Sequence, residues 1–193
     1  MSADVRLRRA VPDDVAAVVA LVESAYRGEG SRAGWTTEAD LLDGQRTDGE
    51  GIAAVLADPE ASLLVAELGD GADGELVGCC EVRLNGWSGL GGREGPGAGA
   101  YFGTFAVRPG LQGAGIGSRL LAEAEAEAVR RWGSPALVMT TLRQRADLLA
   151  WYRRVGFVET GETRPFPYGD ERYGRPRRPD LEFVVLRRPV ARA

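Results

Sequence analysis

The segment from residue 107 to residue 118 constrains the fold of this chain most strongly. It reads Val-Arg-Pro-Gly-Leu-Gln-Gly-Ala-Gly-Ile-Gly-Ser and lies between a predicted strand, 100–108, and a long amphipathic helical pattern, about 117–132. A glycine-rich turn that opens a helix presents free N–H groups and the positive end of the helix dipole, which favour phosphate. The segment therefore predicts an α/β domain with an anion-binding loop, or else a turn that only packs the helix on the sheet.

The remaining segments predict one mixed domain over residues 1–193. Turn signals separate the strands, and capping residues, proline and glycine mark the helix ends. Residues 86–99 contain seven glycines and predict an exposed, flexible excursion, whereas 163–180 predicts a long ordered loop. The further predicted strands are 5–9, 63–68, 75–84, 136–142, a run from 157, and 181–186. The further predicted helices run from Pro12 to about Tyr26, from a cap at Thr36 or Thr37, over 51–57, and over 147–155.

The amino-acid composition excludes several catalytic mechanisms and metal sites. The 193 residues include 24 basic side chains, all of them arginine, and neither lysine nor histidine. This excludes Ser-His-Asp and Cys-His catalysis, histidine metal sites, Schiff-base lysines and the Walker loop. The two cysteines, Cys79 and Cys80, are adjacent, so we expect small core residues rather than a disulfide or a zinc site. Proton transfer must use carboxylates, tyrosine, cysteine, water or the backbone, and we expect no metal.

Charge is distributed unevenly along the chain. Residues 1–99 carry a net charge of −10 and the remainder +6, so there is no coherent basic face and we expect no nucleic-acid partner. The division suggests two ligand surfaces of opposite preference, or only solubilising charges. No apolar run reaches membrane-spanning length and no secretory pattern opens the chain. We therefore expect a cytoplasmic protein, without membrane contact, that is a monomer or a homodimer.

Dinucleotide binding fits the glycine loop poorly. A Rossmann pattern that starts at Gly113 needs a third glycine where Ser118 stands. It also needs an acidic residue after the next strand to bind the ribose, and residues 136–142 end in Thr-Thr-Leu. The loop moreover follows half of the chain rather than the first strand. Another phosphate-bearing ligand is favoured.

Two motifs resemble those of the GNAT N-acetyltransferases. The spacing Gln-x-x-Gly-x-Gly at Gln112, Gly115 and Gly117, just after Val-x-Pro, resembles the coenzyme A loop of that family. Residues 150–157, Ala-Trp-Tyr-Arg-Arg-Val-Gly-Phe, resemble its later helix, which carries a tyrosine followed four residues on by Gly-Phe. The order of predicted elements over roughly 5–188 also agrees with the family.

The resemblance implies an α/β (α+β) fold: a mixed, mostly antiparallel sheet of about six to seven strands, flanked by helices, with splayed central strands. It implies acetyl-CoA as cosubstrate, its pantetheine arm paired with the backbone of Phe105, Ala106 and Val107. Many relatives have asparagine where Arg145 stands, and an arginine there could reach a coenzyme phosphate instead. The implied pyrophosphate loop consists of Gln112, Gly113, Ala114, Gly115, Ile116, Gly117 and Ser118.

Acetyl transfer to an amine needs a base for the amine, a polarised carbonyl and an acid for the leaving thiolate. The resemblance implies Tyr152 as the acid, although an aromatic residue here can simply pack on the sheet. A backbone N–H near Phe105 would polarise the carbonyl. Glu81, a charged residue in the middle of a predicted strand, is the candidate base, or only a partner of Arg83; Glu162 is a second candidate.

We therefore expect an acetyl-CoA-dependent N-acetyltransferase that acts by direct attack in a ternary complex. The acceptor would be a primary amine of a small molecule or peptide. The alternative is a non-catalytic acyl-CoA-binding or regulatory module on the same fold. Aromatic residues that could line the acceptor pocket, or only anchor the core, are Tyr26, Trp35, Tyr101, Phe166 and Tyr168. Acidic residues that would attract a cationic acceptor are Glu23, Glu29, Glu38, Asp40 and Asp43.

Overall fold

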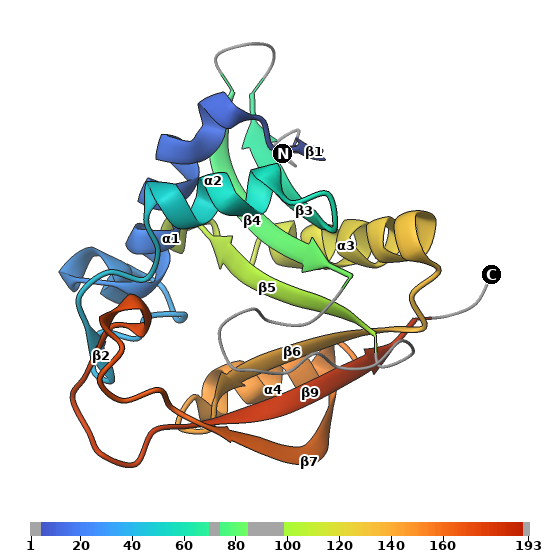
Figure 1. The fold of residues 1–193 in the computed structure, drawn as a ribbon. Coiled ribbons are helices and arrows are strands. Elements are labelled where there is room, and N and C mark those ends of the chain that lie inside the picture. Colours follow the sequence, from blue (N-terminus) through green and yellow to red (C-terminus); the bar gives the residue numbers. More distant parts are fainter. Residues whose placement is uncertain (1–4, 70–73, 85–98, 191–193) are drawn as a thin grey trace.

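The computed structural model describes residues 5–69, 74–84 and 99–190, and its centre is a seven-stranded sheet (Figure 1). The strand order is β1-β3-β4-β5-β6-β9-β7, and every neighbouring pair is antiparallel except β5 and β6. The mixed, mostly antiparallel sheet expected from the resemblance is confirmed. The strands are β1 (Val5–Arg9), β3 (Ala61–Leu68), β4 (Glu75–Arg83), β5 (Ala100–Val107), β6 (Ala136–Leu142), β7 (Val158–Pro165) and β9 (Glu182–Pro189).

Helices cover both faces of the sheet. Helices α1 (Val15–Tyr26) and α2 (Gly49–Ala57) lie on one face, and α3 (Ile116–Trp132) and α4 (Ala146–Arg154) lie on the other. Alternation along β3 supplies both cores, because Leu63 and Val65 pack beneath α1 whereas Leu64 and Ala66 pack against α3. Burial on both faces explains why β3 and β4 are almost continuously apolar in sequence.

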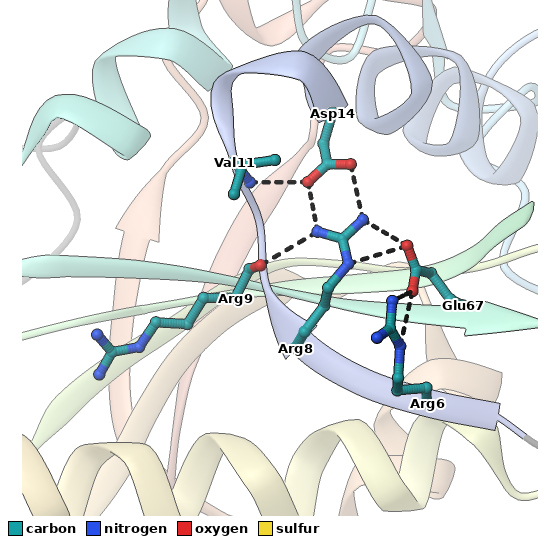
Figure 2. Close-up of polar contacts among 6 residues, drawn as sticks. All are labelled: Arg6, Arg8, Arg9, Val11, Asp14 and Glu67. Atoms are coloured by element: carbon teal, nitrogen blue, oxygen red, sulfur yellow. Dashed lines mark hydrogen bonds and ion pairs between the residues drawn. The ribbon is translucent and has the colours of Figure 1, made fainter. Parts of the chain in front are cut away.

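An ionic cluster fixes the start of α1 to the edge of the sheet (Figure 2). The guanidinium of Arg8 lies between two carboxylates, with Nη1 2.6 Å from Asp14 Oδ2 and Nε 2.9 Å from Glu67 Oε1. Asp14 also accepts a hydrogen bond from the backbone N–H of Val11, at 2.7 Å. Arg6 donates to the other oxygen of Glu67. One arginine thus joins β1, β3 and the turn that opens α1.

The helix predicted from Thr36 or Thr37 is wrong. The segment contains a 3₁₀ turn, Glu29–Ala33, and then a short strand, β2 (Leu42–Asp43), which pairs with β8 (Arg175–Pro176). The hydroxyl of Thr36 donates to the carbonyl oxygen of Ala25 instead of capping a helix. The loop predicted over 163–180 likewise contains the end of β7, a 3₁₀ turn and β8. The excursion predicted over 86–99 lies almost wholly outside the described residues.

Glu127 on α3 is buried, although charged residues on an amphipathic helix are usually exposed. Its side chain is 1% exposed, because Ser62 donates a hydrogen bond to it and Arg9 and Arg130 form ion pairs with it. The predicted strands over 5–9, 63–68, 75–84, 100–108 and 136–142, and the helices over 117–132 and 147–155, are confirmed to within two residues. No helix in the described ranges is long and apolar enough to span a bilayer.

The two central strands separate after a short contact. Residues 100 and 101 of β5 pair with residues 137 and 138 of β6, and Figure 1 shows the strands diverging from there. β5 remains paired with β4 through Val107, and β6 with β9 through Leu142. The register of β4 and β5 shifts beside Thr104, whose φ of 44° is the single positive value among the described non-glycine residues. The splay expected from the resemblance is therefore present.

Candidate active site

Three adjacent spaces surround the diverging end of β5. We call them the inner cavity, of about 120 Å³, the loop groove, of about 150 Å³, and the outer cavity, of about 650 Å³. The inner cavity shares Tyr26, Phe105 and Leu148 with the loop groove. The residues that it shares with the outer cavity are Tyr26, Arg46, Glu81, Thr104 and Tyr173. Tyr26 borders all three spaces, so they meet beside β5.

The loop groove exposes the backbone that opens α3. Gly113 and Gly115 have φ values of 88° and 84°, which favour glycine, and a Cβ added to either would meet no heavy atom within 4 Å. The first N–H groups of a helix have no carbonyl partner within the helix. The groove is lined by Gly113, Gly115, Gly117 and Ser118 of this loop, so the geometry suits a phosphate group.

Not every residue of the predicted loop faces the groove. A Cβ on Gly117 would lie 3.1 Å from Cζ of Phe105, so packing of α3 against β5 also requires this glycine. Ile116 is buried in the core, and Ala114 is exposed without lining the groove. Ala106 and Val107 are buried in β5. Of these three β5 residues, Phe105 and Val107 line the groove, and Phe105 also borders the inner cavity.

The side chain of Gln112 joins the loop to a distant segment. Its Oε1 accepts the backbone N–H of Trp35 at 2.9 Å, and its Nε2 donates to Thr36 Oγ1 at 2.8 Å. Nε2 also donates to the carbonyl oxygen of Val107 at 3.1 Å. The sequence motif indicates a loop residue here, but nothing in it indicates a partner 77 residues away.

Arg145 holds the same segment from the other side. Its guanidinium is 6% exposed and donates to the carbonyl oxygens of Trp35 and Thr36, at 3.0 and 2.9 Å, and to Asp147. The guanidinium that the resemblance considers for a coenzyme phosphate is thus occupied by these protein partners. Trp35 consequently borders the loop groove but neither the inner nor the outer cavity. The centroid of its ring lies 6.2 Å from that of Trp151.

The other aromatic candidates divide between two positions. Tyr26, Tyr101 and Phe166 line the inner cavity, whereas Tyr168 lies half exposed beside none of the three spaces. The hydroxyl of Tyr26 donates to the carbonyl oxygen of Phe105. Tyr26 therefore fixes the backbone of β5 at the point where the strands separate.

Tyr152 reaches the inner cavity from α4. It is 2% exposed, and its ring packs at 5.4 Å from Phe157 and 6.5 Å from Phe105. Burial, with the nearby phenols of Tyr26 and Tyr101, raises the pKa of Tyr152 well above its ordinary value. The phenol is therefore protonated at neutral pH, as a proton donor must be, and the ring also packs on the sheet.

Glu81 lies where the inner and outer cavities join. Its carboxylate is almost fully buried; Arg83 Nε donates to Oε1 and Thr104 Oγ1 donates to Oε2, each at 2.9 Å. The expected pairing with Arg83 is thus present, and the carboxylate also faces both spaces. Glu162 lies exposed on β7 beside Arg164 and borders none of the three spaces.

The five acidic residues expected to attract a cation all have partners. Arg27 pairs with Glu38, Arg32 with both Glu29 and Asp40, and Arg177 with Asp43. Glu23 accepts the backbone N–H groups of residues 46 and 47. Their charges are compensated locally, which weakens the basis for long-range attraction by this group.

The cysteines belong to the core. Cys79 and Cys80 are fully buried free thiols, as expected, and burial raises the pKa of Cys79 to about 12. A thiol with so high a pKa is a poor nucleophile at neutral pH. Within the described residues, no group of three or more cysteine or acidic side chains is arranged to hold a metal ion.

The fold and the site together define an α/β protein in which two central strands separate beside a glycine-capped helix. The loop that opens this helix suits a phosphate group, and a cavity lies next to it. A family model described as "Acetyltransferase (GNAT) family" matches residues 17–157. The chain belongs to this family, whose members use acetyl-CoA.

Comparison with individual proteins agrees with that assignment. An "IAA acetyltransferase" of Azospirillum brasilense is 34% identical over 117 residues, which cover 60% of this chain and 65% of the relative. The ribosomal-protein-S18-alanine N-acetyltransferase of Escherichia coli has the same fold, with a TM-score of 0.65, 15% identity, and coverage of 98% of this chain and 96% of that one. A Bacillus anthracis protein described as a streptothricin acetyltransferase, solved with acetyl coenzyme A, gives a TM-score of 0.53 at 18% identity over 72% of this chain and 67% of that one.

Proposed function

We propose that this chain transfers the acetyl group of acetyl-CoA to a primary amine of a small molecule or peptide, by direct attack in a ternary complex. The observation that carries the proposal is the adjacency of the three spaces. The loop groove, which suits a phosphate, shares Phe105 with the inner cavity, and that cavity shares Glu81 with the larger outer cavity. Coenzyme and acceptor would thus approach one point from two different sides.

The loop groove fits the coenzyme end of the reaction. The N–H groups of residues 113–118 would hold the pyrophosphate, and the backbone of Phe105, Ala106 and Val107 would hold the pantetheine arm. The carbonyl oxygens of Phe105 and Val107 already accept hydrogen bonds from Tyr26 and Gln112. Since a carbonyl oxygen has two lone pairs, each can accept a further bond from a ligand.

The inner cavity supplies the groups that the transfer needs. An alkylamine is mostly protonated at neutral pH, and Glu81 would take its proton directly or through a water molecule. The amine nitrogen then bonds to the acetyl carbon, and as the carbon–sulfur bond breaks the nitrogen loses its second proton to solvent. A backbone N–H of β5 near Phe105 would stabilise the carbonyl oxygen, and Tyr152 would give its proton to the departing thiolate. Solvent then restores the proton of Tyr152 and accepts that of Glu81.

A panel of amines tests the proposal. Purified protein is incubated with acetyl-CoA and, in turn, small primary amines, peptides with a free N-terminus and peptides with a lysine side chain. We expect thiol release that depends on the amine, and a product heavier by one acetyl group in mass spectrometry. Coenzyme binding measured by calorimetry, with no acetylated product from any amine, would instead support the non-catalytic module.

A further inference from the structure

Two arginines share a single carboxylate at the acceptor side of the inner cavity. Arg27 Nη1 lies 2.5 Å from Glu38 Oε2, and Arg46 Nε lies 3.8 Å from the same oxygen. All three side chains line the inner cavity. We refer to them as the Arg27–Glu38–Arg46 cluster. It carries two positive charges and one negative charge.

The cluster leaves hydrogen-bond donors unused. Nε and Nη2 of Arg27 are buried without a partner, although this side chain is only 5% exposed. Among the described residues, Arg46 makes no side-chain hydrogen bond, and its contact with Glu38 is too long to be one. Buried donors without acceptors are costly in a folded protein, so these groups, beside a cavity, are available to an anionic ligand.

Arg46 is the member of the cluster that a ligand can reach. Its side chain is 39% exposed and borders both the inner and the outer cavity. The guanidinium carbon lies 5.5 Å from the ring centroid of Tyr26, whose hydroxyl binds the backbone of Phe105. Arg46 therefore lies on the path from the outer cavity to the point where β5 and β6 separate.

Neighbouring carboxylates leave the donors of the cluster unused. Glu81, on the same path, is already paired with Arg83, and Arg172, at the wall of the outer cavity, is paired with Asp170. The carboxylate of Glu23 lies near Arg46 but accepts the backbone N–H groups of residues 46 and 47. A carboxylate of a ligand would accept the free N–H groups of the cluster, because the planar guanidinium matches a carboxylate with two parallel bonds.

We propose that the Arg27–Glu38–Arg46 cluster binds a carboxylate of the acceptor, with Arg46 making the direct contact. The acceptor class is then an amine that carries a carboxylate near its amino group, as an amino acid or a dipeptide does. The inference rests on the proposed function and narrows its substrate. The amine would point toward Glu81 while the carboxylate stays on Arg46.

Matched acceptors test this directly. Each amino acid is compared with its carboxamide and with the corresponding decarboxylated amine, and kcat/KM is measured by thiol release. We expect the wild-type protein to prefer the acid by about 10- to 100-fold, as charge-assisted hydrogen bonds provide. Arg46→Met removes that preference, mainly through the KM of the acid, and Arg46→Lys retains part of it. Arg177→Met, which removes a surface arginine that is paired with Asp43 and lines none of the three spaces, leaves the preference intact.

The outcomes separate this inference from the proposed function. Acetylation of carboxamides and simple amines as efficiently as acids overturns the inference and leaves the acetyltransferase function standing. An acid preference that Arg46→Met does not reduce also overturns it. Absence of product from every amine overturns both. Folding of each variant is checked by circular dichroism, and its coenzyme binding by calorimetry. These controls show that a lost preference for the acid does not result from unfolding or from loss of coenzyme binding.

Discussion

Tyr152 illustrates how a single residue can serve packing and chemistry together. Its ring lies among Phe105, Trp151 and Phe157, and it borders the inner cavity. Tyr152→Phe keeps the ring and removes the hydroxyl. We expect kcat to fall by about 10²- to 10⁴-fold, the usual contribution of a general acid, while coenzyme affinity stays unchanged. A variant with the wild-type kcat would show that water protonates the thiolate.

The raised pKa of Tyr152 predicts the shape of the pH profile. Because burial keeps the phenol protonated to well above its ordinary pKa of 10, the acid form persists throughout the usual assay range. The rate should therefore rise as the amine loses its proton and should show no descending limb below about pH 10. A fall between pH 7 and 9 that Tyr152→Phe abolishes would contradict this prediction.

Glu81 can be tested against its neighbour. Glu81→Gln removes the negative charge but keeps the shape, so a general base at this position predicts a loss in kcat of about 10²- to 10⁴-fold. Arg83→Gln removes the partner and leaves the carboxylate. If Glu81 only pairs with Arg83, the two variants should lose activity and stability equally. Activity is measured by thiol release, and stability by urea denaturation.

Single residues also show where reasoning from the sequence ends. The motif around Gln112 predicts its place in the loop, and the local pattern predicts that Tyr152 lies on a helix. The contacts of Gln112 and Arg145 with Trp35 and Thr36 join segments 76 to 110 residues apart. Such contacts depend on tertiary arrangement, which no local pattern contains. For the same reason no local pattern indicates that Trp35 borders the loop groove.

Among the elements, the turn that opens α3 has the most specific backbone. Gly115 caps the helix in the left-handed region, and the space beyond its Cα is open. Gly115→Val places a branched side chain there, which strains the backbone and fills the groove. We expect at least a tenfold loss of coenzyme affinity in calorimetry, with the fold retained. Gly110→Val is the matched control, since this loop glycine has an ordinary φ and does not line the groove.

The cluster in Figure 2 predicts how β1, β3 and α1 respond to acid. Hydrogen bonds from Arg8 hold the pKa values of Asp14 and Glu67 below their ordinary values of 3.8 and 4.5. Carboxylates with lowered folded-state pKa values stabilise the protein above those ordinary values, and this contribution is lost as the pH falls through the folded-state pKa. The free energy of unfolding should therefore decrease below about pH 4.5.

Glu67→Gln identifies the source of that dependence. We expect it to lower the free energy of unfolding at pH 7 by about 1–3 kcal/mol, because it leaves two arginines without their shared acceptor. It should also flatten the decrease below pH 4.5 in urea titrations. Asp180→Asn, which removes an exposed pair with Arg178, should change neither by more than about 1 kcal/mol. Equal effects of the two substitutions would contradict a special role for the cluster.

Helices and strands are predicted correctly where a regular pattern of apolar residues extends over many consecutive positions. The amphipathic stripe of α3 and the apolar runs of β3, β4 and β6 predict these elements to within two residues. The helix assigned near Thr36 failed because Leu42 pairs with Pro176, 134 residues away, and packs with Phe166 and Leu181. A threonine followed by two leucines is compatible with either structure until that partner is known.

The whole chain, residues 1–193, is predicted to unfold as one domain. The cluster of buried side chains beneath α3 and α4 includes residues from both sides of the splay, among them Phe102 and Phe157, whose rings lie 6.3 Å apart. We expect circular dichroism and tryptophan fluorescence to report coincident urea transitions. Two separated transitions would show that the halves of the sheet are independent.

The two-residue ladder between β5 and β6 also bears on how the chain is synthesised. Strands β1, β3, β4 and β5 pair only among themselves apart from that ladder, and all of them precede residue 108. Strands β6, β7 and β9 pair among themselves and follow residue 135. A nascent chain can therefore complete its first four-stranded unit, with α3 against it, before the ribosome has made the second. The open space between the strands is then the seam where the later half docks on the earlier one.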